Sequence, residues 1–234
     1  MTQRKRILAL LALPVIVLLT GATSPPDRVA RAEAEEEPFD EARIFFEFNA
    51  TDNDLGVQVK LDGDAWKRLR IFGPGDRRIL NLSVDGRLGM LGLTELFFES
   101  DEPSPQEVLN LLKEGEYDFE GLTVDGEVLE GESELSHDLP PAPNIIVPSV
   151  AGEELDRLDA VIEWGAISGI ASWEIIVENE DAGAEMTIPL SAGATSLHIP
   201  EEFHDPHTEY KVEVLAIGTN GNKTISERVF VTGS

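Results

Sequence analysis

The sequence predicts an all-β protein that consists of two β-sandwich domains in tandem, the first with one short crossover helix. Short segments in which apolar and polar residues alternate recur along the chain, as expected of strands that bury one face. Turn sequences rich in Gly, Asp and Asn separate these segments. The run Pro140-Pro141-Ala142-Pro143 divides the pattern in two, because it favours an extended linker and cannot donate hydrogen bonds to a sheet.

The amino-terminal residues 1–32 have the pattern of a signal peptide followed by a short linker. Basic residues at positions 4–6 precede an apolar run at 7–20, which is too short to span a membrane comfortably. We therefore expect an exported protein, periplasmic or extracellular, that is cleaved after Ala22 or Ala32 and has no membrane span in its mature form. An uncleaved single-helix anchor is the alternative.

The charge balance is strongly acidic, with 18 basic and 45 acidic residues and a formal net charge of −27. Removing residues 1–32 leaves 13 basic and 44 acidic residues, which gives a net charge of −31. A field of this sign repels phosphate backbones and anionic lipids, so the composition argues against nucleic acids and membrane surfaces as partners. The same charge keeps an exported surface soluble.

The chain contains no cysteine. Disulfides, thiolate metal sites, cysteine nucleophiles and thioether lipidation are therefore excluded. Each domain must be held together by the packing of its own core.

Four segments follow the signal peptide in the predicted domain organisation. Residues 33–42 are expected to form an acidic flexible leader, because they contain three consecutive glutamates and no apolar periodicity. The amino-terminal β-sandwich domain is expected at 43–139, the proline-rich linker at 140–143 and the second domain at 144–234. A linker of this composition is semi-rigid and would keep the two domains apart.

In the first domain, alternation predicts strands at 43–49, 57–61, 66–72, 78–84, 93–99, 117–120 and 128–135. Asp62-Gly63 is expected to form a hairpin turn between two of these strands. Ser104 and Pro105 have the pattern of a helix start, with a capping residue and a first-turn proline. They predict the short crossover helix, which ends before Gly115 and covers the sandwich.

In the second domain, the same reasoning predicts strands at 160–164, 173–178, 184–189, 196–199, 209–217 and 226–232. Trp164 lies on the first of these strands, Trp173 opens the next, and Tyr210 follows a Thr-Glu segment at the start of the fifth. With this order of features, residues 141–234 resemble a fibronectin type III domain, an immunoglobulin-like sandwich.

The resemblance implies that Tyr210 closes a corner between the two sheets, with its ring in the core and its hydroxyl bound to nearby backbone. It also implies an interaction or spacer module and not a reaction. The loop at 219–223 contains no Arg-Gly-Asp sequence, so integrin-type adhesion is not implied. Segments 46–58 and 61–66 of the first domain look like the amino-terminal domain of uncharacterised exported bacterial proteins, which implies no activity.

Asp52, Asp54, Asp62 and Asp64 are candidate ligands for Ca²⁺, which prefers carboxylate and carbonyl oxygens. An EF-hand loop needs glycine at its sixth position and glutamate at its twelfth, whereas counting from Asp52 gives a valine and a glycine. Turn formation explains the same residues, because Asp and Asn side chains bond to the local backbone. No other cofactor is expected.

His198, His204 and His207 are close enough in sequence to suggest a zinc site, but they flank turns, and we interpret them as surface-loop residues. His137 is expected to pack at the domain junction. The sequence has no Gly-x-Ser-x-Gly elbow and no Gly-rich phosphate loop, so we predict that the protein is not an enzyme.

Glycosylation sequons begin at Asn49, Asn81 and Asn222, and they matter only in a host that glycosylates exported proteins.

The leading hypothesis is a secreted or periplasmic, non-enzymatic interaction or spacer protein. It would bind a protein or carbohydrate partner through loops or an exposed sheet edge. Two alternatives stay open, namely a Ca²⁺-stabilised surface protein and an accessory subunit of an extracellular hydrolase. The sequence determines neither the ligand nor the oligomeric state.

Overall fold

The structure is a computed structural model that describes residues 36–234. The predicted signal peptide at 1–32 and the first residues of the leader lie outside the described residues. Glu35–Ser234 form one compact unit. Within the described range, no helix combines the length and the apolar character that crossing a membrane requires.

The amino-terminal half consists of seven strands and two short helices. Their bounds are β1 Glu36–Pro38, β2 Glu41–Asn49, β3 Asp54–Gly73, β4 Arg77–Ser83, α1 Gly86–Leu91, β5 Leu93–Glu99, α2 Pro105–Leu111, β6 Gly115–Thr123 and β7 Val128–Leu135. The predicted hairpin turn at Asp62-Gly63 is wrong, because both residues lie inside the 20-residue strand β3. Partners on both edges hold this stretch extended, since Asp62 lies opposite Glu41 of β2 and Glu95 of β5.

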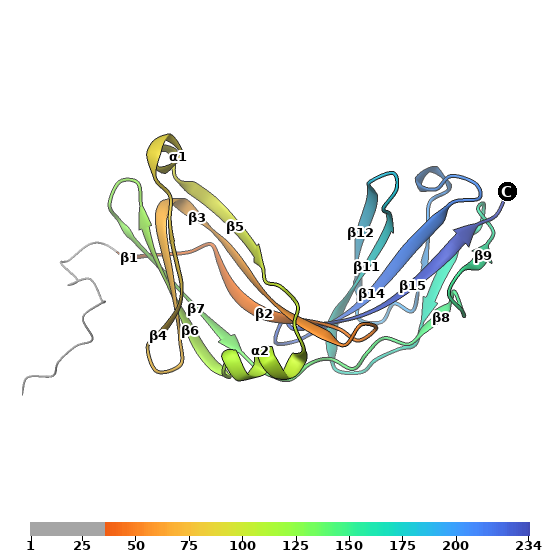
Figure 1. Cartoon of the computed structure of the whole chain (residues 1–234), viewed down its shortest axis with the longest axis horizontal. Helices are drawn as coiled ribbons and strands as arrows, with labels where there is room; N and C mark the ends of the chain where they lie inside the picture. Colours follow the sequence, from red (N-terminus) through yellow and green to blue (C-terminus); the bar gives the residue numbers. More distant parts are fainter. Residues whose placement is uncertain (1–35) are drawn as a thin grey trace, which may run out of the picture. The chain divides into compact units, whose positions relative to one another are not determined.

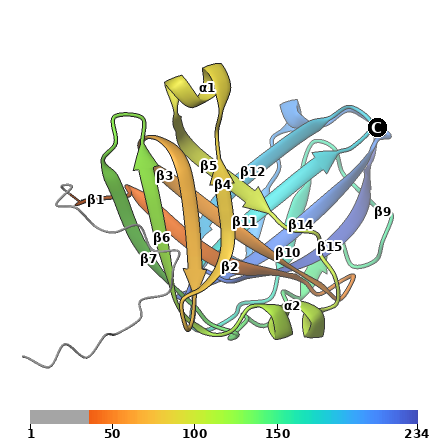
Figure 2. The ribbon, with the colours of Figure 1, turned by 60° about the vertical axis from the view of Figure 1, so that its left-hand side comes forward.

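Strand β3 organises this half, because it is long enough to pair with four other strands. Its first part pairs with β2 and β5, and its second part pairs with β4 and β6. Trp66 pairs with Leu93 of β5 on one edge and with Thr123 of β6 on the other. Strands β4 and β5 therefore follow one another along the same edge of β3, and α1 is an excursion between them (Figure 2). Strand β7 extends the sheet beyond β6, and β1 pairs with β7 in parallel.

The crossover helix α2 begins where the sequence predicts it. Pro105 occupies its first turn, and the Glu107 side chain reaches back to accept a hydrogen bond from the Ser104 backbone N–H at 3.2 Å. Val108 is its one buried residue. The helix is thus fixed by its cap and by a single apolar anchor.

Helix α1 is a second helix that the sequence analysis did not predict. It is six residues long, contains two glycines and buries none of its side chains, so neither propensity nor periodicity indicates it. Gly92 ends it with a φ of 79°, and a Cβ at this position would lie 2.9 Å from the Ala65 backbone and the Val124 side chain. Glycine is therefore required where the chain returns to β5.

The core of the amino-terminal half is built around β3. Its buried members are Phe39, Ile44, Phe46, Leu55, Val59, Leu61, Trp66, Leu69, Ile71, Val108, Tyr117, Phe119, Leu129 and Leu135. Phe39 corrects the expectation of a flexible leader through residue 42. Its ring is buried in this core and its N–H donates to the Glu130 carbonyl at 2.9 Å, so the chain is ordered from β1 onward.

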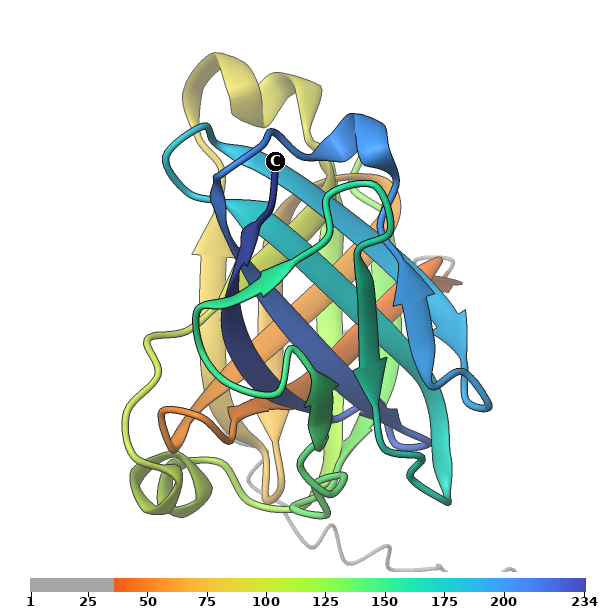
Figure 3. The ribbon, with the colours of Figure 1, turned by 90° about the vertical axis from the view of Figure 1, so that its right-hand side faces the viewer.

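The carboxyl-terminal half contains all six strands that the sequence predicts, and two short ones in addition. The bounds are β8 Ile145–Val147, β9 Glu153–Leu155, β10 Val161–Trp164, β11 Ile170–Asn179, β12 Ala184–Ser191, β13 Ser196–His198, the 3-10 helix η1 Glu201–Phe203, β14 Glu209–Gly218 and β15 Lys223–Thr232. Strands β13, β10 and β8 form one sheet, and β12, β11, β14 and β15 run side by side in the other. Figure 3 shows the smaller sheet in front of the larger one.

Aromatic side chains fill the space between these two sheets. Trp164 and Trp173 meet edge to face with ring centroids 5.7 Å apart, and Tyr210 stacks on Phe230 at the same distance. The Tyr210 hydroxyl accepts a hydrogen bond from the Asp205 backbone N–H at 2.9 Å. This geometry confirms the corner tyrosine and the all-β sandwich predicted for this half.

Strands β2 and β15 connect the two halves. They pair in parallel, with Glu47 opposite Lys223, Phe48 opposite Thr224 and Asn49 opposite Ile225. The pairing makes one hydrogen-bonded sheet of 12 strands (Figure 1). The two hydrophobic clusters nevertheless remain separate, because the second consists of residues from Ile145 onward.

Candidate functional site

The contact between β2 and β15 brings together hydrogen bonds, ion pairs and a cation–π contact from both halves of the chain. We call it the joint, and its members are Phe45, Phe46, Glu47, Ser136, Asp138, Pro140, Glu174, Asn222, Lys223 and Thr224.

Asn222 is the centre of the joint. Its side chain is only 1% exposed. Its Oδ1 accepts a hydrogen bond from the Phe46 N–H at 2.9 Å, and its Nδ2 donates to the carbonyls of Ser136 at 2.8 Å and Asp138 at 2.9 Å. One amide side chain thus satisfies three backbone groups of the amino-terminal half, which is nearly its full hydrogen-bonding capacity.

Lys223 connects three strands through charge. Its Nζ lies 3.3 Å from Glu47 Oε2 on β2 and 2.9 Å from Glu174 Oε1 on β11, and it also lies over the Phe45 ring at 5.8 Å from the centroid. Burial alone would lower the pKa of Lys223, but the two carboxylates raise it above its ordinary value. The lysine therefore stays charged in a largely buried position.

The proline linker and the residue before Leu139 are bound to the start of β15 and to the loop that precedes it, so the linker is not a free tether. The Thr224 hydroxyl donates to the Pro140 carbonyl at 2.8 Å, and Asn220 Nδ2 donates to the Asp138 carbonyl at 2.8 Å. These bonds give two carbonyl groups in and next to the proline-rich segment a partner outside a sheet.

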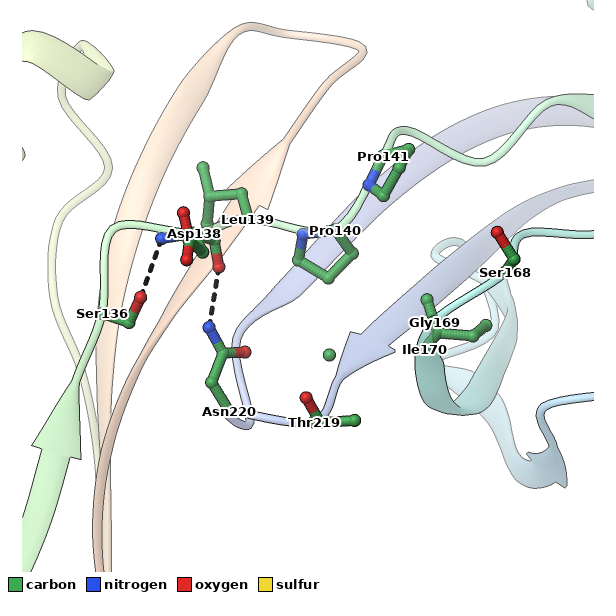
Figure 4. Close-up of a pocket in the computed structure, with 11 residues that line it drawn as sticks. Ser136, Asp138, Leu139, Pro140, Pro141, Ser168, Gly169, Ile170, Thr219 and Asn220 are labelled. Carbon is green, nitrogen blue, oxygen red and sulfur yellow. Dashed lines mark hydrogen bonds between the residues drawn. The ribbon is translucent and has the colours of Figure 1, made fainter.

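A groove of about 310 Å³ lies beside the linker, with Pro140, Pro141, Ile170 and Asn220 among its walls (Figure 4). Asp138 is the one ionisable residue among those that line it. General acid–base chemistry requires convergent titratable groups, so the lining of this groove does not favour a catalytic site.

Carboxylates crowd the face of the sheet next to the joint. Oxygens of Glu47, Glu99 and Glu102 all lie within 4.8 Å of one another, and we call these three residues the acidic triad. Burial raises the pKa of Glu47, and the attraction of Lys223 offsets only part of this effect. Burial also raises the pKa of Glu102, with further contributions from the Asp54 and Glu99 carboxylates. Within the triad Lys223 is ion-paired with Glu47, and repulsion between the carboxylates adds to the raised pKa values of Glu47 and Glu102.

The structure separates the four aspartates that the sequence suggests as Ca²⁺ ligands. Asp52 lies in the turn before β3, and Asp54 is the first residue of that strand, with one buried carboxylate oxygen that has no hydrogen-bond partner among the described residues. Asp62 lies eight residues further along β3, which is roughly 26 Å of strand, and Asp64 lies beyond it. Both are exposed. One ion cannot bind all four residues, so Ca²⁺ binding stays a prediction for separate parts of this set.

Turn chemistry accounts for the residues around Asp52. Asn49 Oδ1 accepts hydrogen bonds from the backbone N–H groups of Thr51 at 2.9 Å and Asp52 at 3.3 Å, and Asn53 has a φ of 59°. These are the features of an Asx turn followed by a left-handed residue.

The histidines occupy three different environments. His198 is exposed and lies 3.0 Å from Asp159, and His207 is exposed in the loop before β14. The surface-loop interpretation is wrong for His204, which is 4% exposed and packs edge to face on Tyr210, with neither ring nitrogen bonded to a described residue. Burial lowers the pKa of His204. His137 packs on Phe46 at 5.7 Å, next to the joint, as predicted.

The structure distinguishes the three glycosylation sequons. Asn222 is buried within the joint, so its amide is inaccessible to a glycosyltransferase in the folded protein. Asn49 is partly buried and bonds to Glu227, whereas Asn81 is exposed on β4.

Sequence reasoning missed the joint and the acidic triad. Phe46 and Asn222 are 176 residues apart, and Glu47 and Glu99 lie on strands that are not consecutive. The turn sequence at 220–222 indicates a hairpin, but nothing in it indicates that its last asparagine reaches a strand of the other half.

No protein-family model matches the sequence, and no curated protein matches it. Among solved structures, the FN1–FN3 domains of chicken CNTN1 are similar with a TM-score of 0.34 and 9% identity. The match covers 86% of this chain and 66% of that one, just under two thirds. A two-domain fibronectin type III segment of chicken tenascin has a TM-score of 0.32 and 9% identity, over 74% of this chain and 90% of that one.

The fibronectin(III)-like modules of Clostridium thermocellum CbhA have a TM-score of 0.33 and 11% identity, over 83% of this chain and 92% of that one. All three structures contain fibronectin type III domains, but at these scores the likenesses carry no argument by themselves. The all-β sandwich fold rests on the strand order and the Tyr210 corner of this chain. The resemblance of the first domain to exported bacterial proteins stays a prediction.

Proposed function

We propose that this chain is an exported, non-enzymatic interaction or spacer protein whose two β-sandwich domains are held in a fixed relation by the joint. The domains correspond to residues 43–139 and 144–234, with 140–143 as the linker between them. Periplasmic or extracellular localisation is part of the proposal and rests on the sequence pattern at 1–32.

The observation that carries the proposal is the hydrogen bonding of Asn222. A flexible tether would leave each domain free, whereas here one buried side chain bonds to β2 and to the segment that leads into the linker. Buried bonds to three backbone groups make separation of the halves costly, because each group would lose its partner. A fixed spacing between two sandwiches is what a spacer provides.

A distance measurement tests the fixed spacing. The chain has no cysteine, so Ser83→Cys on β4 and Thr187→Cys on β12 introduce two exposed and unique sites for spin labels, one in each half. We expect a single narrow distance distribution in pulsed electron resonance, and a broader one when Asn222→Ala is added. Asn220→Ala is the matched control, because it removes one exposed bond and one partly buried bond of the same loop and leaves the three bonds of the Asn222 side chain in place.

A broad distribution in the doubly labelled protein with an intact Asn222 would overturn the fixed relation. Localisation is tested separately, by fractionation of the host and by the mass of the processed amino terminus. Recovery of the chain in the cytoplasm with residues 1–32 intact would contradict export.

A further inference from the structure

The edge of β5 is an open strand edge in the part of the chain that the structure describes. Among the described residues, β5 pairs with β3 alone, so the backbone groups on its other edge have no strand partner. Natural edge strands are guarded by Pro, by charged side chains, by bulges or by being very short. β5 is seven residues long, lacks Pro and Lys, and carries only the negative charges of Glu95 and Glu99, whereas the edge strand β12 of the other half contains Pro189. Negative charge repels an acidic strand from this edge but not a basic one.

The backbone of β5 alternates in the direction of its hydrogen bonds. The N–H of Ser100, directly after the strand, donates to the Val57 carbonyl of β3 at 3.0 Å. Because antiparallel pairing alternates along a strand, the N–H groups of Glu95, Phe97 and Glu99 are directed to the free edge. This edge therefore offers three donors in register for another strand.

Exposed apolar side chains gather beside this edge. Leu88, Met90, Leu91, Phe97 and Phe98 are five of the nine large hydrophobic side chains that are exposed in the described part of the chain. Met90 is 79% exposed and Phe97 is 53% exposed. They lie on α1 and β5, which adjoin along one edge of the sheet (Figure 2). Neighbouring residues of a strand point to opposite faces of the sheet, so Phe97 and Phe98 expose an apolar side chain on each face of this edge. Exposed apolar side chains on both faces of an open edge favour an interaction surface.

Negative charge gathers at the far end of the same strand. Glu99 ends β5, and Glu102 follows it within the acidic triad. No described lysine or arginine is ion-paired with Glu99 or Glu102. Lys223, the lysine next to the triad, is paired with Glu47. Glu95 on the strand lies opposite Asp62, a like-charge pair that has no benefit for the fold itself.

These charges select the kind of strand that fits the edge. A second copy of this chain would bring the same glutamates and a net charge of −27 or below, which repels. Opposite charges across neighbouring strands are favourable, so lysine or arginine side chains suit the end with Glu99 and Glu102. Apolar side chains suit the end with α1.

We propose that the free edge of β5 binds an extended segment of another protein, which adds to the sheet as a strand with apolar side chains near α1 and basic side chains beside Glu99 and Glu102. This proposal rests on the proposed interaction function and specifies its partner. Main-chain bonds to Glu95, Phe97 and Glu99 provide affinity, and the two ends of the edge provide direction and specificity.

Synthetic peptides test the proposal directly. The probe is a fluorescent eight-residue peptide of alternating valine and threonine that carries two lysines near one end, made in both chain directions. Its control carries glutamate in place of lysine. By fluorescence anisotropy we expect one lysine peptide to bind at least about tenfold more tightly than its glutamate control. Amide exchange should slow at Glu95, Phe97 and Glu99 on binding.

Two variants identify the site. The double variant with Glu99→Lys and Glu102→Lys should prefer the glutamate peptide to the lysine peptide. The control variant with Glu116→Lys and Glu134→Lys changes the net charge equally, at exposed positions on β6 and β7, and should keep the preference for the lysine peptide. Phe97→Pro removes an edge donor without removing a bond to β3, and should abolish binding. Circular dichroism confirms that each variant is folded.

Three results would overturn the proposal. They are the absence of binding by every peptide, an equal loss of preference in both charge variants, and a dimer in sedimentation that Phe97→Pro dissociates, which would make a second copy the occupant. The distance measurement at the joint does not involve β5. Failure of the peptide tests with a narrow distance distribution would therefore leave the spacer function intact.

Discussion

Replacing Asn222 by alanine is the most direct test of how the two halves are held together. The substitution removes an acceptor for the Phe46 N–H and donors to the Ser136 and Asp138 carbonyls. The Asp138 carbonyl keeps its bond from Asn220, but the buried Phe46 N–H and the Ser136 carbonyl lose the partners described here.

The magnitude follows from these three bonds. A buried hydrogen bond contributes roughly 1 kcal/mol net, and an orphaned buried group costs about 1–3 kcal/mol. We therefore expect Asn222→Ala to lower the free energy of unfolding by about 3 kcal/mol. In a chain of this size, 1 kcal/mol shifts the melting temperature by roughly 2–4 °C, so the expected decrease is about 6–12 °C.

Urea unfolding followed by circular dichroism measures this loss, with Asn220→Ala as the control. Asn220 is exposed and makes one bond to Asp138 and one within its own turn, so its replacement should cost only about 1 kcal/mol. An Asn222→Ala protein as stable as the Asn220→Ala protein would refute the reasoning, because burial and bond count would then have no effect at this site.

Three further substitutions follow from the same structure. Tyr210→Phe removes the acceptor for the Asp205 N–H, so it should lower the urea midpoint by the equivalent of about 1–2 kcal/mol and leave the slope unchanged. An unchanged midpoint would contradict a stabilising role of this hydrogen bond. The folded pKa of His204 lies below 6.5, so its contribution to stability is present above pH 6.5 and is lost as the pH falls through the folded pKa. His204→Phe should therefore raise the free energy of unfolding by about 1 kcal/mol or more, and by more at pH 5.5 than at pH 8. Urea unfolding at both pH values measures this, and the same pH dependence in the variant and the unsubstituted protein would contradict it. The pKa of Glu102 is raised on folding, so pH affects its contribution to stability in the opposite direction. This contribution is present below the unfolded pKa of 4.5 and is lost as the pH rises through the folded pKa. Glu102→Gln should raise the free energy of unfolding at pH 7 but not at pH 4, by no more than about 1 kcal/mol because the side chain is partly solvated, and urea unfolding at the two pH values measures this difference.

Local pattern was sufficient for most strands, and particular elements show where it failed. Strands β10 to β15 and helix α2 lie where alternation and capping place them, because their patterns depend on neighbours in sequence. Asp62-Gly63 was misread as a turn, because pairing with β2 and β5 keeps a turn-prone dipeptide extended. Phe39 was assigned to a flexible leader, because its burial depends on strands far along the chain.

The candidate site was less accessible to prediction than the fold. Asp52 and Asp62 resemble one ligand set in sequence. In the structure Asp62 lies far from Asp52, because each residue of the extended strand β3 adds its full rise to the distance between them. Glu47 and Glu102 are distant in sequence and meet because β3 brings β2 and β5 to its two edges. Charge clusters of this kind depend on register, which short-range pattern does not encode across non-consecutive strands.

The sequence by itself determined the fold class, the positions of most strands and the acidic, cysteine-free character of the chain, because each depends on composition or on spacing within one element. The corner role of Tyr210 was implied by the resemblance to a fibronectin type III domain. The tertiary structure alone decided that Asn222 is a buried bridge, that the proline linker is bound and that β5 is an open edge. The physical reason is that burial and pairing arise between strands distant in the chain, and only the folded arrangement specifies which backbone groups find partners there.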